Sequence, residues 1–275
     1  MNDSFELILK PSSGWQPINL REIWLYRELF AFLIWRDIKI RYRQTALGAL
    51  WAILQPLLAM LIFTVFFNRI GGVAKDIAVP YPLFSFCGVL AWTFFANSIT
   101  ASSNSLIGNR QLIAKIYFPR IFIPLGAIGA LVVDLFWSIA IAICLLIYYK
   151  WGFFSQILLL PVFIFVTFIA ASGVGLFFSG LNVQFRDVKY VVPFFVQMGL
   201  FVTPVIYPLE YIPERYRLLL GLNPMAGMVD GFRYSLLGTP AHWNVILLST
   251  TVSIVIFVSG LFVFKRLERR FADII

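Results

Sequence analysis

Six long apolar stretches constrain this chain more than any other feature of its sequence. They cover residues 46–67, 81–104, 121–148, 153–181, 189–208 and 243–264. A helix needs about 20 mostly apolar residues to cross the hydrocarbon core of a bilayer, and each stretch has that length or nearly so. A soluble core does not need six such runs in 275 residues. The sequence therefore predicts an all-α integral membrane protein with six transmembrane helices.

The basic residues are distributed unevenly between the two sides that six spans would define. Of the 22 lysines and arginines, 16 lie before the first stretch, around the loops after the second and fourth, or after the last. Basic residues accumulate on the cytoplasmic side of membrane proteins. We therefore predict a multi-pass protein with both termini in the cytoplasm. Contacts with membrane lipid and a protein partner explain the net charge of +9 better than nucleic acid does.

The chain divides into a leader, residues 1–43, and a membrane domain, residues 44–275. Within the leader, residues 20–43 hold an apolar run too short to span, two tryptophans and a basic cluster. Tryptophan and basic residues favour the headgroup level, so we expect an interfacial helix on the cytoplasmic leaflet. The alternative is a basic anchor that only fixes topology. The candidate residues of this helix are Arg36, Asp37, Arg41, Tyr42 and Arg43.

The cytoplasmic loop at 105–120 is the best candidate for contact with a soluble partner. A short amphipathic helix can form from Asn109 to Ile116 and is ended by Pro119. It would offer apolar residues for packing and basic residues for the surface. The alternative is a loop that lies on the membrane and only sets topology. The candidate residues are Asn109, Arg110, Leu112, Lys115, Tyr117, Phe118 and Arg120.

The segment from residue 207 to 242 is outside the membrane in this topology but is not plainly polar. Prolines and glycines divide it into pieces of about 8–13 residues, which are too short to cross. We predict two short re-entrant or interfacial helices within 207–238, shielded by protein or by a water-filled cavity. Apolar residues such as Leu218, Leu219, Met225 and Met228 are expected to be buried against the outer ends of the spans.

Three polar residues stand out inside the predicted spans: Gln55, Asn97 and Asp134. Asp134 is the sole ionisable residue deep in a predicted span, and such residues are functional candidates. The alternative is that its carboxyl group locks helix packing through hydrogen bonds to polar groups of the second stretch. His242, at the outer end of the last stretch, reads as an interfacial residue rather than a ligand or a base.

Recognisable catalytic chemistry is missing from the sequence. It has no phosphate-binding loop of the Gly-x-x-x-x-Gly-Lys-Ser/Thr type, no metal-ligand spacing and no paired carboxylates within one span. We therefore expect no catalytic residues, no metal site and no cofactor bound by this chain, and an energy source supplied by another protein. A different class of protein, a membrane-embedded transferase acting on lipid-linked sugars, would need acids or histidines clustered at one membrane face. The sequence shows no such cluster.

Several sequence blocks resemble those of the permeases of polysaccharide-export ABC transporters. They occur in the order found in that family and extend over most of the chain. The blocks are WRDIKIRYRQTALG at 35–48, WAILQP at 51–56, KIYFPR at 115–120, LNVQFRD at 181–187, PVIYP at 204–208 and LNPM at 222–225. The resemblance implies the membrane subunit of an exporter that moves polyprenyl-pyrophosphate-linked polysaccharide, O-antigen in particular, across a bacterial inner membrane. Capsular polysaccharide and teichoic acid exporters are similar and remain alternatives.

The resemblance also implies an assembly and a division of roles. Two copies of the permease would form a homodimer, with a channel at its interface, and join two copies of an ABC ATPase that bind the ATP and magnesium. The loop at 105–120 would be the coupling helix, and the segment before the first span would be the interface helix. The segment at 207–238 would form the external gate helices. The gate residues implied are Pro204, Tyr207, Pro208, Asn223, Pro224 and Met225.

Overall fold

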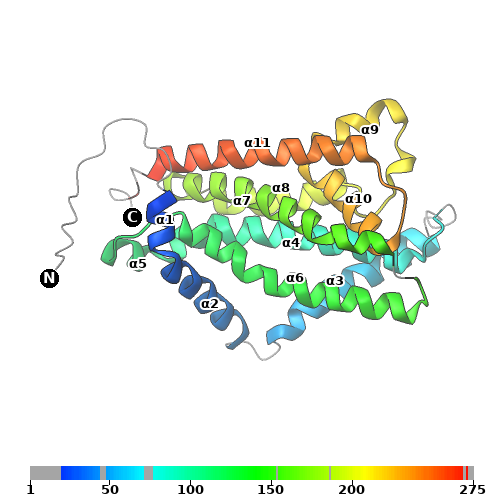
Figure 1. Ribbon diagram of the computed structural model, residues 1–275, viewed down its shortest axis with the longest axis horizontal. Helices are drawn as coiled ribbons and strands as arrows, with labels where there is room; N and C mark the ends of the chain where they lie inside the picture. The colour runs from blue at the N-terminus through cyan, green and yellow to red at the C-terminus, as the bar shows by residue number, and fades with distance from the viewer. Residues whose placement is uncertain are drawn as a thin grey trace.

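The computed structural model of the chain describes residues 20–43, 48–70, 77–152, 154–185, 187–268 and 271. Within those ranges every regular element is a helix, as the composition predicts (Figure 1). The predicted leader at 1–19, the start of the first predicted span at 46–47, and Arg186 of the LNVQFRD block lie outside the described residues.

Four helices run side by side along the long axis and are long and apolar enough to cross a membrane (Figure 1). Their bounds lie close to four of the predicted stretches. The most buried of the four is α4, which packs against α6 and α7, while α11 packs along α7. Prolines stand in the first turns of α4 and α7, where the missing N–H is not needed. The helices are α4 (Tyr81–Gly108), α6 (Phe122–Tyr148), α7 (Leu160–Gln184, after the 3₁₀ turn η3, Ser155–Leu159) and α11 (Trp243–Glu268).

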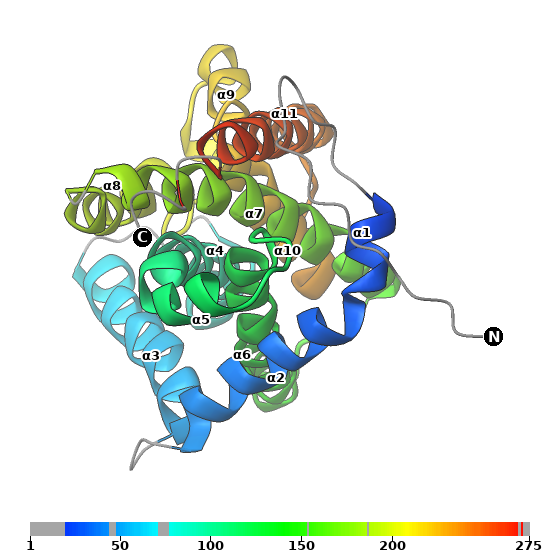
Figure 2. The same cartoon turned by 90° about the vertical axis from the view of Figure 1, so that its left-hand side faces the viewer.

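Two further apolar helices are shorter. One is α3 (Gly48–Phe63), which continues into the π-helical turn η1 (Thr64–Ile70); the other is α8 (Val188–Val202). Viewed along the bundle, both lie on one side of α4 (Figure 2). Their apolar lengths, Ile53–Phe67 and Val188–Val202, fall short of the roughly 20 residues of a typical span. The count of six spans therefore stays a prediction.

One end of the bundle carries α1 (Leu20–Leu25), α2 (Arg27–Arg43) and α5 (Arg110–Lys115), together with both ends of the described chain (Figures 1 and 2). A separate apolar cluster holds this end together. It contains Leu33 of α2, Leu106 of α4, Phe118, and Phe264 and Phe271 from the C-terminal end. From there α2 slants along α6, with which it packs.

The opposite end carries η4 (Leu209–Tyr211), α9 (Glu214–Leu220) and α10 (Pro224–Leu237). The ends of α10 are set by its sequence. Asn223 caps it by accepting a 3.0 Å hydrogen bond from the Met225 N–H, and Gly238 ends it with φ of 68°. Twelve residues of α10 are buried, including Met225 and Met228, whereas Leu218 and Leu219 of α9 are 53% and 61% exposed. The expectation of burial was therefore right for the two methionines and wrong for the two leucines.

Glycines allow α7 and α11 to approach each other closely. A Cβ atom built on Gly260 would lie 2.1 Å from the Gly173 carbonyl oxygen, and one built on Gly173 would lie 2.6 Å from the Phe257 backbone. Only glycine allows this approach, which is typical of helix pairs in membranes. The two helices therefore meet backbone to backbone.

Candidate functional site

The predicted coupling loop has an anchored side and an exposed side. Phe118 is buried in the cluster at this end of the bundle, and the Arg120 guanidinium donates a 3.0 Å hydrogen bond to the Glu268 carbonyl. Within α5 the side chain of Ile113 is buried, while those of Arg110 and Lys115, and of Tyr117 just after the helix, are exposed. Asn109 ends α4, its side chain donating to the Ser105 carbonyl. The loop thus presents basic and aromatic side chains on a base fixed to α4 and α11.

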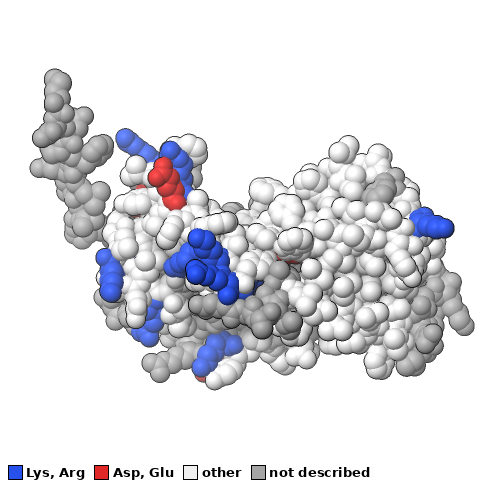
Figure 3. Space-filling view, turned by 90° about the horizontal axis from the view of Figure 1, so that it is seen from below, with Lys and Arg blue, Asp and Glu red and all other residues white. Residues whose placement is uncertain are grey.

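Most lysines and arginines visible from below lie over the half of the molecule that carries α1, α2 and α5 (Figure 3). Arg36 pairs with its neighbour Asp37 at 2.7 Å, and Arg43 is exposed at the end of α2. The predicted coupling residues therefore lie at the end where α2 begins, while the later interface residues, Arg41, Tyr42 and Arg43, follow α2 toward the middle of the bundle (Figure 1).

Asp134 has partners that its sequence context did not suggest. Its carboxylate is 2.9 Å from Arg41 Nε and accepts a short hydrogen bond from the Tyr42 hydroxyl. Asp134 is near the middle of α6, so α2 brings its C-terminal end about halfway along that helix. The expected hydrogen bonds to polar groups of the second stretch are not those observed. An ion pair replaces them, because a carboxylate this deep needs a compensating charge.

A cavity of about 220 Å³ adjoins this ion pair. It brings together all three polar residues singled out in the spans and two of those proposed for the interface helix. Gln55 comes from α3, Asn97 from α4, Asp134 from α6, and Arg41 and Tyr42 from α2.

Arg233 is a second ionisable group inside the bundle, and the sequence analysis missed it. Its side chain, on α10, is 2% exposed and stacks 3.6 Å from the centre of the Phe84 ring. The guanidinium donates to the carbonyls of Val205 at 2.6 Å, Pro204 at 2.7 Å and Phe84 at 3.3 Å. The available signal was an arginine three residues after Asp230 within a short, largely apolar helix.

Two of the predicted gate residues contact Arg233, and the others lie on the turn after α8 and at the start of α10. The Pro204 and Tyr207 carbonyls accept from it, the latter at 3.5 Å. Asn223 donates a 2.8 Å hydrogen bond to the Thr203 hydroxyl and so ties the start of α10 to the end of α8. Pro208 precedes η4, Pro224 begins α10 and Met225 is fully buried. The turn after α8 and the start of α10 thus form one connected unit.

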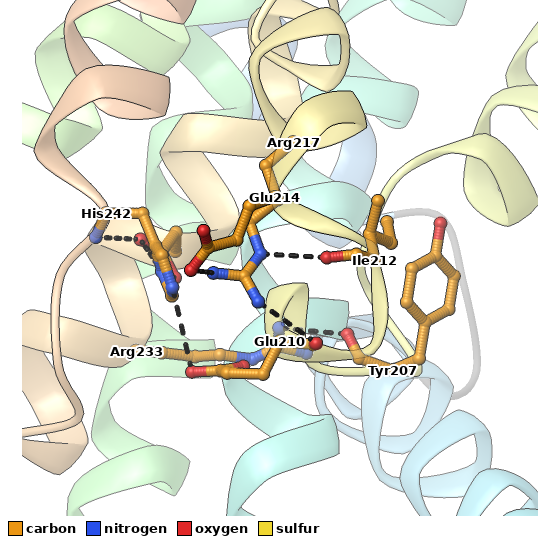
Figure 4. Close-up of polar contacts among 8 residues, drawn as sticks. Tyr207, Glu210, Ile212, Glu214, Arg217, Arg233 and His242 are labelled. Carbon is orange, nitrogen blue, oxygen red and sulfur yellow. Dashed lines mark hydrogen bonds and ion pairs between the residues drawn. The ribbon is translucent and has the colours of Figure 1, made fainter.

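His242 connects this unit to the last helix (Figure 4). Its backbone N–H donates to Asp230 at 2.9 Å, and its Nδ1 lies 3.3 Å from the same carboxylate. Its Nε2 is 3.8 Å from Glu210 of η4. Arg217 of α9 donates to the Ile212 and Glu210 carbonyls at 2.8 and 3.1 Å. His242 therefore makes polar contacts within the protein, beyond the interfacial position predicted for it.

These contacts predict a pH-dependent stability for the outer end. The hydrogen bond to Asp230 raises the pKa of His242 above 6.5, and Glu210 adds to the rise while Arg217 and partial burial oppose it. The folded state thus binds the proton more tightly than the unfolded state. The contribution is complete below pH 6.5 and is lost as pH rises through the folded pKa.

We expect the unfolding temperature of the wild-type protein to fall more steeply than that of His242→Gln as pH rises from about 6 to 8. The measurement is thermal unfolding of both proteins in the same detergent across that range. Parallel curves would show that the Asp230 contact does not depend on the proton.

The site offers polar and charged contacts rather than an arrangement of catalytic groups. Among the residues that the structure describes, no group of three histidine, cysteine, aspartate or glutamate side chains could hold a metal ion. Both buried charges have partners within the chain: Asp134 pairs with Arg41, and Arg233 donates to backbone carbonyls. This suits helices that must be positioned in a membrane.

Comparison with known proteins gives one consistent result. The sequence profile of the family described as ABC-2 type transporter matches residues 28–237. An O-antigen export system permease protein RfbA of Klebsiella pneumoniae is 30% identical over 250 residues, covering 90% of this chain and 95% of the relative. A Myxococcus xanthus protein of the same name is 29% identical over 217 residues, 78% and 82% of the two chains. The polysialic acid transport protein KpsM of Escherichia coli is 27% identical over 202 residues, 72% and 77%. The chain therefore belongs to the ABC-2 type transporter family of membrane proteins.

Proposed function

We propose that this chain is the permease subunit of an ATP-driven exporter of polyprenyl-pyrophosphate-linked polysaccharide. The cargo, O-antigen, moves from the cytoplasmic to the outer side of a bacterial inner membrane. The observation that carries the proposal is the similarity to O-antigen export permeases over 90% of the chain. The more distant similarity to KpsM makes capsular polysaccharide the second candidate cargo, with teichoic acid a further one.

The proposed partners supply the nucleotide binding and hydrolysis for which the sequence has no motif. Two copies of an ABC ATPase supply ATP binding with magnesium and dock at the end that carries α1, α2 and α5. A second copy of the permease meets the first across the side formed by α3 and α8. That side exposes large apolar residues: Leu58, Leu61, Ile62, Phe194, Phe195 and Phe201. The channel runs along this homodimer seam, and both termini face the cytoplasm.

The outer end is the gate in this mechanism. ATP binding closes the ATPase dimer and pushes on α5, and the movement shifts the permeases against each other. At the outer end, α9 covers the bundle with few buried side chains, while α10 is fixed by Arg233. The gate therefore combines a fixed part, α10, with a lightly attached part, η4 and α9.

The docking end is tested by charge reversal. Arg110 and Lys115 are exposed on α5, so Arg110→Glu with Lys115→Glu should reduce co-purification with the partner ATPase at least tenfold. Membrane insertion should be unchanged, since neither residue is buried. The matched control reverses Arg215 and Lys150, which are exposed at the opposite end. Equal recovery of the ATPase with the α5 variant and with wild type would reject docking at α5.

A further inference from the structure

The central helix α4 leaves only one stripe of its surface uncovered. Between Leu83 and Ser105 its residues are buried except for Thr93, Asn97, Thr100, Ala101 and Asn104. The polar members are spaced four, three and four residues apart, which places them on one face of the helix. In a chain that is 60% apolar, an uncovered stripe with four polar residues out of five does not suit contact with lipid tails.

Two cavities follow one another along this stripe. The first, of about 360 Å³, lies toward the α5 end and is lined by Ala101, Asn104 and Asn109 with Arg36 and Asp37 of α2. The second, of about 220 Å³, is the cavity beside Asp134 and includes Thr93 and Asn97. In both cavities α2 and α6 face the stripe. We call the stripe, together with the cavity-lining residues Arg36, Asp37, Arg41 and Tyr42 of α2 and Asp134 of α6, the polar lane.

The side chains in the deeper half of the lane have unused hydrogen-bonding groups. Thr93, Asn97 and Gln55 make no side-chain hydrogen bond to any residue that the structure describes. Thr93 and Asn97 are half-buried and Gln55 is exposed on the single chain. Within a membrane domain such groups still need hydrogen-bond partners, supplied by water or ligand where protein groups do not suffice. The polar groups of this cavity therefore call for a hydrogen-bonding occupant.

The charges along the lane are balanced. Arg36 pairs with Asp37 and Arg41 with Asp134, so the lane carries no net charge from these groups. A balanced lane attracts neither phosphate nor cation strongly. Uncharged, hydroxyl-rich groups can bind its amides and hydroxyls and leave again, as conduction requires. The ring of Trp51, which is half exposed at the deeper cavity, adds a flat face on which a sugar can stack.

We propose that the polar lane is a hydrated entrance for the sugar portion of a lipid-linked glycan. It runs from the α5 end to the exposed face of α3, where the second copy of the permease would meet the first. The lipid tail stays in the bilayer while the sugars follow Asn104, Thr100, Asn97 and Thr93. The cargo in this proposal rests on the proposed function, whereas the hydration of the lane does not.

The hydration is tested by thiol labelling in a background in which Cys87 and Cys144, the two cysteines of the chain, are replaced by alanine. Single cysteines are placed at Asn104, Asn97 and Thr93, and at Phe136 as a control. Phe136 is two residues from Asp134 on α6 and is 65% exposed, so its depth matches while its face differs. A charged, membrane-impermeant methanethiosulfonate needs a thiolate and therefore water.

In inverted membrane vesicles the three lane cysteines should react at least tenfold faster than the cysteine at Phe136. If the cysteine at Asn97 reacts as slowly as the control, the lane is dry and the inference fails, whatever the cargo of the transporter. A polyprenyl-pyrophosphate monosaccharide added to the same vesicles should slow labelling at Asn97 severalfold. If labelling is fast but the added monosaccharide lipid does not slow it, the lane holds water but does not bind the sugar. That result would overturn the sugar part of the inference. Neither measurement depends on the ATPase or on export. A failure of this inference can therefore be told apart from a failure of the proposed function.

Discussion

Replacing Arg233 with methionine is expected to lower the free energy of unfolding by about 3–5 kcal/mol, because each buried acceptor left without a donor costs about 1–3 kcal/mol. Methionine fills similar space, but the carbonyls of Pro204, Val205 and Phe84 lose their donor in a buried site. Each unsatisfied acceptor adds a cost. The measurement is unfolding of the purified protein in mixed micelles, followed by circular dichroism.

Arg215→Met is the matched control for this variant. Arg215 lies on α9 near the same end but is exposed, with its guanidinium over the Tyr216 ring. Its replacement should change stability by no more than about 0.5 kcal/mol. Arg233→Lys should fall between the two, because one ammonium group cannot reach carbonyls on both sides of a planar guanidinium. Similar small losses for the two methionine variants would mean that Arg233 does not hold the outer end together.

Fixing α9 to α11 with a disulfide is expected to abolish export. A Cβ atom built on Gly221, just after α9, would lie 3.1 Å from the Leu248 Cβ. This is a few tenths of an ångström closer than the roughly 3.5–4.5 Å of disulfides, so the bridge requires a small outward shift of the loop. Oxidised Gly221→Cys with Leu248→Cys, in the background without Cys87 and Cys144, should therefore hold the lightly attached part of the gate against the bundle. Polysaccharide at the cell surface is the measurement, with ATP binding by the assembled transporter recorded in parallel.

Export should return when the bridge is reduced, and each single-cysteine variant should export before and after oxidation. Continued export by the fully oxidised double variant would place the exit elsewhere along the dimer seam. Loss of ATP binding in the oxidised form would instead indicate a general disruption of the protein.

The sequence predicted the long helices well because hydrophobic length alone determines them. The stretch at 121–148 appears as α6 at Phe122–Tyr148, and the one at 243–264 as α11 at Trp243–Glu268. The stretch at 189–208 appears only as α8, Val188–Val202, because Pro204 and Pro208 end the helix that an apolar count would continue. The short helix expected around Asn109–Ile116 is also found, as α5.

The polar contacts were beyond the reach of sequence reasoning because their partners are distant along the chain. Arg41 and Asp134 meet only because α2 slants along α6. Arg233 was counted among outer basic residues, since nothing local shows that carbonyls at 204–205 and 84 would surround it. For Leu218 and Leu219 the prediction was wrong in the opposite direction. Their apolar character predicted burial, yet α9 leaves them uncovered in the single chain.

The contact between Gly173 and Gly260 has a consequence for how the protein is made. The two glycines lie on α7 and on α11, and α11 follows α7 in the chain and so leaves the ribosome later. Until α11 has been synthesised and inserted, the face of α7 that carries Gly173 and Gly180 lacks the helix it packs against. Helix association in a membrane follows insertion of the individual helices. Assembly of this half of the bundle is therefore a late, post-insertion event, and a chain cut short before α11 would present an incomplete surface to the insertion machinery.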